Sequence, residues 1–298
     1  MALANTSRSI TDATVEMSHA DKYLYDLTGF LIVRNVLSPE QLRLANAAID
    51  SLDLEPSPSY AGDSGALKGG GTSTRLGNSE DLMGLPQPFC QPFREMLRHP
   101  AVAPALNTIL GEGWRLDHGP GLIAMDTGCE GGMLHGNFDN APSFYREGKI
   151  FTGLTVVEFL LADEGPGDGG VALIPGSHKA NLSCPPEMSR WEQYQDFVLE
   201  VNAKAGDAII FSEACTHGTL PWNGAHQRRA VLYKFNASHM AWGGVGKPPA
   251  ESKPYYDELT LAQKATLEPP SHHSRASKES TGFEALKQQL AAKGGAKL

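Results

Sequence analysis

The stretch KAGDAIIFSEACTHGTLPWNGAHQRRAVLYKF (204–235) decides the fold of this chain. It holds two short runs of branched and aromatic residues, and each run is bounded by Gly, Pro, Asp or Asn. Runs of this length and composition are typical of β-strands joined by turns. No long helical pattern separates them, which argues against a parallel sheet with crossover helices.

The same pattern extends upstream to Trp114. Three further segments are rich in branched and aromatic residues and end in turn residues: RLDHGPGLIAM (115–125), KIFTGLTVVEFLLAD (149–163) and GGVALIPGS (169–177). Many short strands without intervening helices favour a sandwich or a rolled antiparallel barrel. We therefore predict a mainly β fold with flanking helices.

The flanks of this β region contain the predicted helices. Ser38 is a good N-cap, Pro39 suits the first helical position, and Gln41 completes a capping box, so a helix is expected to begin there. Before it, GFLIVRNV (29–36) is typical of a strand, and a helix is expected over 91–110 with a break at Pro100.

We predict a single domain over residues 1–298 with four parts. These are a loose N-terminal arm (1–18), a region with a strand and helices (19–113), the β core (114–240) and a C-terminal extension (241–298). The second part includes the glycine-rich loop KGGGTSTR (68–75).

Composition excludes several classes of function. The formal net charge is −9, which disfavours binding to nucleic-acid phosphates or to anionic lipid. The four cysteines lie far apart and form no C-x-x-C pair, so neither a disulfide framework nor a zinc knuckle is indicated. The start of the chain has no apolar signal segment, and no apolar run is long enough to span a membrane. We expect a cytoplasmic protein with reduced thiols; the oligomeric state is open.

Two histidines form the candidate metal site. His135 in GGMLHGNFDN (131–140) and His217 in FSEACTHGTLPW (211–222) are each expected at the end of an apolar segment, where a strand gives way to a loop that contains glycine. Such positions at the rim of a β-barrel direct side chains toward its mouth. Two histidines with one carboxylate form the facial triad of non-haem Fe(II) oxygenases, which leaves open positions for a cosubstrate and dioxygen.

Three segments resemble the phytanoyl-CoA dioxygenase family of Fe(II)/2-oxoglutarate oxygenases. They are DLTGFLIVRNVLSPEQL (26–42), GDGGVALIPGSHKAN (167–181) and the closing segment 204–235. The resemblance implies a double-stranded β-helix (jelly-roll) core, an enzyme that oxidises a small-molecule metabolite, and Fe(II), 2-oxoglutarate and O2 as its requirements.

The resemblance also assigns site residues. The family's distal histidine corresponds to His217, and the arginine eleven positions later, which pairs with 2-oxoglutarate, corresponds to Arg228. A guanidinium suits the distal carboxylate of a dicarboxylic cosubstrate, because it binds carboxylates bidentately. Arg229 would point to the opposite face of a strand and ranks second. Thr219 could add a hydroxyl donor to the same carboxylate. Four aromatic residues near the ligands could line a substrate pocket, although aromatic residues near a barrel rim more often serve packing: Phe138, Phe144, Tyr145 and Trp222.

The chain departs from the family at the carboxylate position, where His-x-Asp is replaced by His135-Gly136-Asn137. Asn137 could bind iron through its carbonyl oxygen, or Asp139 or Glu213 could substitute. A straight strand would place Glu213 roughly 13 Å from His217, so that choice requires a bulge or a bend. Alternatively a halide could fill the position, as in the iron halogenases of this superfamily, or water could. Loss of iron chemistry, leaving a non-catalytic binding protein, is the last alternative.

Overall fold

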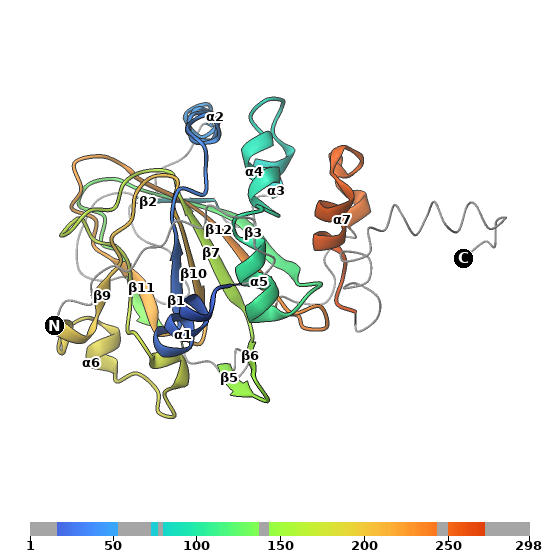
Figure 1. The fold of residues 1–298 in the computed structure, drawn as a ribbon. Helices are drawn as coiled ribbons and strands as arrows, with labels where there is room; N and C mark the ends of the chain where they lie inside the picture. Colours follow the sequence, from blue (N-terminus) through green and yellow to red (C-terminus); the bar gives the residue numbers. More distant parts are fainter. Residues whose placement is uncertain (1–16, 53–72, 77–79, 137–142, 243–249, 272–298) are drawn as a thin grey trace.

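The computed structural model describes residues 17–52, 73–76, 80–136, 143–242 and 250–271. Within them, the strands form two main antiparallel sheets and one hairpin (Figure 1). The major sheet has the order β1 (Phe30–Val33), β10 (Ala208–Ser212), β7 (Thr155–Leu160), β12 (Arg228–Asn236), β3 (Arg115–Met125), β2 (Ser73–Leu76). The minor sheet has the order β4 (Gly132–His135), β11 (His217–Leu220), β8 (Gly170–Leu173), β9 (Leu199–Glu200). Strands β5 (Ser143–Arg146) and β6 (Lys149–Thr152) form the hairpin.

Helices flank the sheets. The α-helices are α1 (His19–Thr28), α2 (Pro39–Asp50), α3 (Glu80–Gly84), α4 (Gln91–Met96), α5 (Ala103–Leu110), α6 (Pro186–Ser189) and α7 (Leu261–Leu267). Short 3-10 helices are η1 (Ser177–Lys179), η2 (Gln195–Phe197), η3 (Ala250–Ser252) and η4 (Tyr256–Glu258). Figure 1 shows α3, α4, α5 and α7 on one side of the molecule and α6 on the other, near the minor sheet. None of the described helices is long and apolar enough to cross a membrane.

The central strands of the major sheet are buried on both faces, which explains their continuous apolar sequence. In β7 every residue is buried. Val157 and Phe159 belong to the cluster shared with the helices, whereas Val156 and Leu160 belong to the cluster shared with the minor sheet. The residues of β7 that face the minor sheet therefore line the interior of the jelly roll, and Glu158 lies among them.

Local predictions at the N-terminal side are confirmed. Ser38 caps α2 and forms the capping box with Gln41. The helical region 91–110 is divided into α4 and α5 around Pro100. The mainly β fold and the jelly-roll core are confirmed as well. Most of the arm, most of the glycine-rich loop and the end of the C-terminal extension lie outside the described residues, so the four-part division remains a prediction.

The turn Pro175-Gly176-Ser177-His178, within the segment GDGGVALIPGSHKAN (167–181), has a structural role. Nε2 of His178 lies 3.1 Å from the carbonyl oxygen of Asp26 near the end of α1. The ring of His178 lies against Gly29, the C-cap residue of α1, whose φ is +84°. A Cβ at Gly29 would overlap this ring. The turn thus fixes the junction between α1 and β1, and His178 is not part of the metal cluster described below.

Candidate metal centre

The two predicted histidines meet between neighbouring strands of the minor sheet. His135 ends β4, His217 begins β11, and the two residues are paired directly in the antiparallel register. Their ring centroids are 4.4 Å apart. His217 therefore lies at the start of a strand rather than at the end of one, but the strand pairing still brings the two imidazoles together.

Both imidazoles present the same nitrogen to the cluster. Nδ1 of His217 lies 2.7 Å from the carbonyl oxygen of Cys215, and Nδ1 of His135 lies 3.1 Å from that of Met133. A carbonyl oxygen can only accept, so each Nδ1 carries the proton and each Nε2 retains a lone pair. This is the usual way in which proteins orient a metal-binding histidine.

Glu213 is the carboxylate beside the pair. His135, Glu213 and His217 each offer a ligand atom, and these atoms all lie within 4.8 Å of one another. Oε2 of Glu213 is 3.8 Å from Nε2 of His217. Two imidazole nitrogens and one carboxylate are the donor set that suits Fe(II).

A turn between the two sheets brings Glu213 to this place. Strand β10 ends at Ser212, and residues 213–216 turn before β11 begins in the other sheet. The backbone N–H of Glu213 donates to the carbonyl of Leu154, which anchors the turn to the start of β7. A single straight strand from Glu213 to His217 would have kept them apart, and the bend that this candidate required is present.

Glycine allows β4 to lie close to the same turn. Gly136 follows His135 with φ +144°, and a Cβ there would lie 2.8 Å from the carbonyl carbon of Cys215 and 2.9 Å from Cα of Thr216. A side chain at this position would push the two backbones apart. Gly136 is therefore required for the approach of His135 to the turn that carries Glu213.

The protonation states in the cluster suit a cation. Burial, and then the neighbouring His135, lower the pKa of His217 to about 3, so His217 is neutral at neutral pH. Burial opposes ionisation of Glu213, but the charges of His217 and Lys234 outweigh it and lower its pKa to about 2. Because His217 is neutral at neutral pH, Lys234 is the cation that acts there. Its Nζ lies 2.6 Å from Oε1 of Glu213.

Arg228 lies in the interior of the jelly roll and is fully buried. It begins β12 two residues before Ala230, which packs in the cluster between the two sheets. Arg229 points the other way and forms an ion pair with Asp50 on α2, at 2.7 Å. The ranking of Arg228 above Arg229 agrees with this arrangement. Thr219 is buried on β11, two residues beyond His217.

Sequence reasoning missed the partners of Arg228. Nη2 of Arg228 donates to Oε1 of Glu158 at 2.6 Å, and Nε lies 2.8 Å from Oε1 of Glu164. Gly170 leaves room for this pair, since a Cβ on it would overlap Glu164 and approach Nε of Arg228 to 3.0 Å. The glycines of GDGGV were a signal for close packing, but they do not name the residues that pack there.

The remaining predicted site residues either lie outside the described part of the chain or are not members of this cluster. Asn137, Asp139 and Phe138 lie outside the described residues. Trp222 is fully buried and donates to the carbonyl of His226, so it is a core residue rather than a pocket wall. Phe144 and Tyr145 are exposed on the β5–β6 hairpin.

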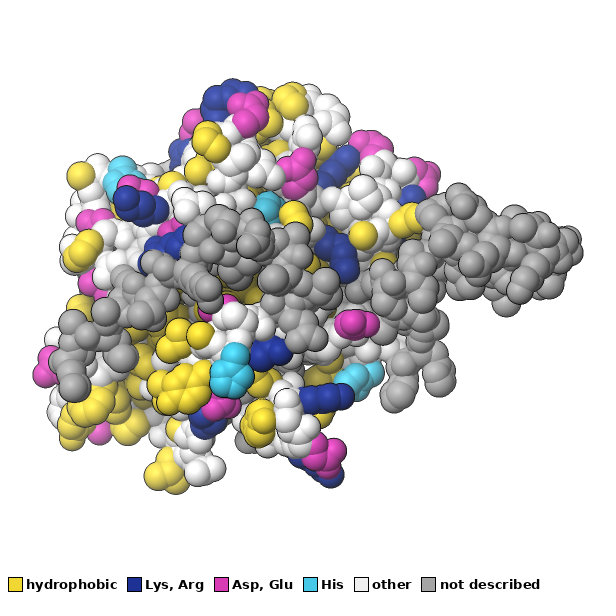
Figure 2. Space-filling model, in the orientation of Figure 1, with side chains coloured by type: hydrophobic (Ala, Val, Ile, Leu, Met, Phe, Trp, Pro, Cys, Tyr) yellow, Lys and Arg dark blue, Asp and Glu magenta, His cyan; other side chains and the backbone are white. Residues whose placement is uncertain are grey.

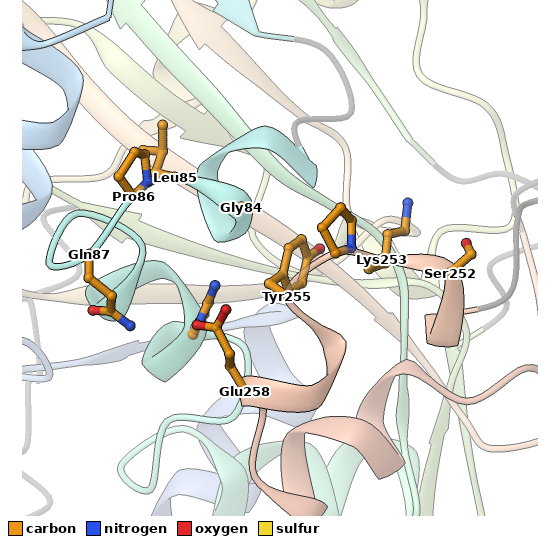
Figure 3. A pocket seen from close by; sticks show the side chains of 10 residues that line it. Gly84, Leu85, Pro86, Gln87, Ser252, Lys253, Tyr255 and Glu258 are labelled. Atoms are coloured by element: carbon orange, nitrogen blue, oxygen red, sulfur yellow. The ribbon is translucent and has the colours of Figure 1, made fainter.

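A surface pocket lies on other elements. It is lined by residues at the end of α3 and just after it, by Arg94 on α4, and by residues of η3 and η4 and between them. Figure 3 shows Glu258 of η4 among the lining side chains. Arg94 donates to the carbonyl of Met83 and to Glu258, so its charge is already balanced there. On the face drawn in Figure 2, Lys and Arg side chains are interspersed with Asp and Glu side chains.

The model of the phytanoyl-CoA dioxygenase (PhyH) family matches residues 25–230, well over half of the chain. The chain belongs to the phytanoyl-CoA dioxygenase family. It is accordingly an Fe(II)/2-oxoglutarate-dependent dioxygenase, with Fe(II), 2-oxoglutarate and O2 as its requirements.

Solved structures share the fold of this PhyH-family protein. HygX from Streptomyces hygroscopicus with nickel and 2-oxoglutarate bound superposes with a TM-score of 0.63 at 18% identity, covering 77% of this chain and 91% of HygX. HygX with hygromycin B also bound gives 0.62 with the same identity and coverage. AviO1 from Streptomyces viridochromogenes Tue57 gives 0.52 at 17% identity, covering 78% of this chain and 100% of AviO1. No curated protein sequence matches the chain.

Proposed function

We propose that this PhyH-family dioxygenase oxidises a C–H bond of a small-molecule metabolite at an iron centre held by His135, His217 and Glu213. The cluster of two imidazoles and one carboxylate within 4.8 Å carries the proposal. A small-molecule substrate is in keeping with the HygX structure that holds hygromycin B. Bound Fe(II) together with 2-oxoglutarate would supply the activation of O2 for C–H oxidation.

The protein's own residues would prepare the centre. The carbonyls of Cys215 and Met133 fix the imidazole tautomers, and Lys234 holds one oxygen of Glu213. The other oxygen of Glu213, Oε2, is the one nearer to His217. One-oxygen ligation of this kind would leave the remaining positions of the metal to cosubstrate and O2.

Hydroxylation is favoured over halogenation because a carboxylate, Glu213, lies beside the two histidines. The halide alternative requires a carboxylate to be missing from the centre. Glu213 places a carboxylate beside both histidines, so Asn137 at the family's usual position does not leave the cluster without one. We propose Glu213 as the third ligand in place of Asn137 and Asp139.

Cosubstrate binding is assigned by proposal to Arg228, with Thr219 as a hydroxyl donor. Arg228 is a buried guanidinium, and a guanidinium suits the distal carboxylate of 2-oxoglutarate because it binds carboxylates bidentately. Thr219 lies on the strand that begins with His217, and the same strand pairs with Gly170, which lies against Arg228.

An anaerobic titration tests the proposed centre. Fe(II) and 2-oxoglutarate should together produce a visible charge-transfer band that is lost in His217→Ala. Glu213→Gln keeps the shape of the side chain and removes its charge. We expect it to weaken Fe(II) binding about 100-fold or more, since even residues that only orient ligands change affinity 10–100-fold.

Asn137→Ala is the matched control. It should leave Fe(II) affinity within a few-fold of the parent if Glu213 is the ligand. The opposite result, a large loss in Asn137→Ala with none in Glu213→Gln, would assign the third position to Asn137. No band in a well-folded parent protein would refute the proposed centre.

A further inference from the structure

The interior of the jelly roll contains a second charged group besides the metal cluster. Arg228 is fully buried, and the side chains of Glu158 and Glu164 are only 3% and 1% exposed. Glu158 comes from β7 in the major sheet, and Glu164 follows that strand. Oε2 of Glu164 also accepts from the backbone N–H of Val171 at the start of β8. The guanidinium is thus held from two sides.

The charges of this group do not leave room for another anion. Two carboxylates already face one guanidinium, so a cosubstrate carboxylate would be the third. Burial raises the pKa of Glu164 to about 7, which means that a large fraction of it is neutral near neutral pH. Arg228 and Glu158 then form a balanced pair at 2.6 Å. A further buried carboxylate without a countercharge is unfavourable, because burial of an unpaired charge is costly.

We propose that Glu158 is an internal competitor for the distal carboxylate of 2-oxoglutarate. This inference rests on the proposed function, in which Arg228 binds that carboxylate. The Glu158 carboxylate occupies the guanidinium in the free protein, and the cosubstrate binds by displacing it. Displacement leaves the buried Glu158 carboxylate without its countercharge, and this cost weakens the binding of 2-oxoglutarate. Glu158 thereby sets the affinity for 2-oxoglutarate without contacting iron, and it is a specificity-determining residue for the cosubstrate.

Glu158 suits this role better than Glu164. One hydrogen bond, from Nη2 of Arg228, holds the Glu158 carboxylate in the described structure. Glu164 has the additional bond from Val171 and sits in the space left by Gly170. Its backbone also forms a two-way bridge with Ala203. Glu158 is therefore the carboxylate that can yield to the cosubstrate.

The test measures cosubstrate binding rather than turnover. Protein loaded with Ni(II), which does not react with O2 here, is titrated with 2-oxoglutarate by calorimetry. Glu158→Gln should lower the Kd for 2-oxoglutarate at least tenfold, a change of about 1.4 kcal/mol. The probe 2-oxopentanoate has the same carbon chain without the distal carboxylate, and its Kd should not change in the same variant.

Asp50→Asn is the matched control. It removes the carboxylate paired with the neighbouring Arg229 on the outer face of the same strand. It should leave the Kd of both 2-oxo acids unchanged. Glu158→Asp provides a second variant if Glu158→Gln fails to fold, since it keeps the charge and withdraws it by one methylene. It should also bind 2-oxoglutarate more tightly than the parent.

The failures are distinguishable. If the parent protein does not bind Ni(II), or binds no 2-oxoglutarate once loaded, the proposed function itself fails. If the parent binds both and Glu158→Gln has an unchanged Kd, Arg228 and Glu158 do not form the cosubstrate site. If Glu158→Gln binds 2-oxoglutarate more weakly, Glu158 positions Arg228 instead of competing for it. Either of the last two results overturns the inference.

Discussion

Gly136→Ala should damage both the stability of the protein and its metal site. The new Cβ would overlap the carbonyl oxygen of Cys215 and lie 2.8–2.9 Å from two further backbone atoms, Cys215 C and Thr216 Cα. Ordinary contacts begin near 3.4 Å, so the strands must separate by roughly half an ångström or more. Backbone cannot rotate away as a flexible side chain can.

The expected loss has two parts. Overpacking of this kind costs about 1–3 kcal/mol. A positive φ at a non-glycine residue adds about 1–3 kcal/mol. Gly128 separates the two terms, because it also has a positive φ of +89° but no atom within 4 Å of an added Cβ. Gly128→Ala therefore measures the cost of a positive φ without overpacking, at +89° rather than the +144° of Gly136.

Urea unfolding of the metal-free protein gives the first measurement. Gly136→Ala should lose about 1–3 kcal/mol more than Gly128→Ala. Titration with Mn(II) gives the second. Metal ligands must be held within about half an ångström of the productive geometry. We therefore expect Mn(II) affinity to fall tenfold or more in Gly136→Ala and to stay unchanged in Gly128→Ala. Equal stability and equal Mn(II) affinity in the two variants would refute the role given to Gly136.

Two further predictions concern the buried charges. Lys234→Met removes the ammonium that lies 2.6 Å from Oε1 of Glu213. The side chain of Lys234 is 20% exposed and that of Glu213 is 4% exposed, so the pair is intermediate between a surface and a buried ion pair. The variant should therefore destabilise the metal-free protein by about 2 kcal/mol. Mn(II) should then raise the melting temperature of Lys234→Met by more than that of the parent, because the cation replaces the missing countercharge; a smaller rise would mean that Lys234 mainly positions Glu213. Burial raises the pKa of Glu164 to about 7, so the folded state favours its protonated form. The contribution of Glu164 to the free energy of unfolding is therefore complete below pH 4.5 and declines as the pH rises through 7. The total decline is at most about 3 kcal/mol. Unfolding curves between pH 4.5 and 8 should show Glu164→Gln gaining stability relative to the parent as the pH rises, and a constant difference would contradict the shift.

The sequence predicted those features that depend on neighbours along the chain. The capping box of Ser38 and Gln41 and the break at Pro100 are local, and both are found. Arg228 could be separated from Arg229 because strand residues alternate between faces. His135 and His217 were paired through their contexts, and the register of β4 and β11 brings them together.

The remainder depends on contacts that no local pattern specifies. Glu213 was discounted as long as it was placed on one straight strand with His217, whereas a turn between sheets separates them. Glu158 meets Arg228 across 70 residues of sequence. Strand β7 is paired with β12, where Glu158 lies opposite Leu232, and the two long side chains bridge the remaining distance along the strands. Trp222 was a candidate for a pocket because it is aromatic and close to His217, although packing is the more frequent role of such residues, and it does fill the core.

The turn that carries Glu213 has a consequence for how the protein loosens. Glu213 is anchored to the major sheet through Leu154, while His135 and His217 belong to the minor sheet. A cation held by all three residues would cross-link the two sheets, and its free energy of binding would stabilise their packing against each other. Iron-starved protein should then open first along this seam, with faster amide exchange in β4 and β11 than in β7.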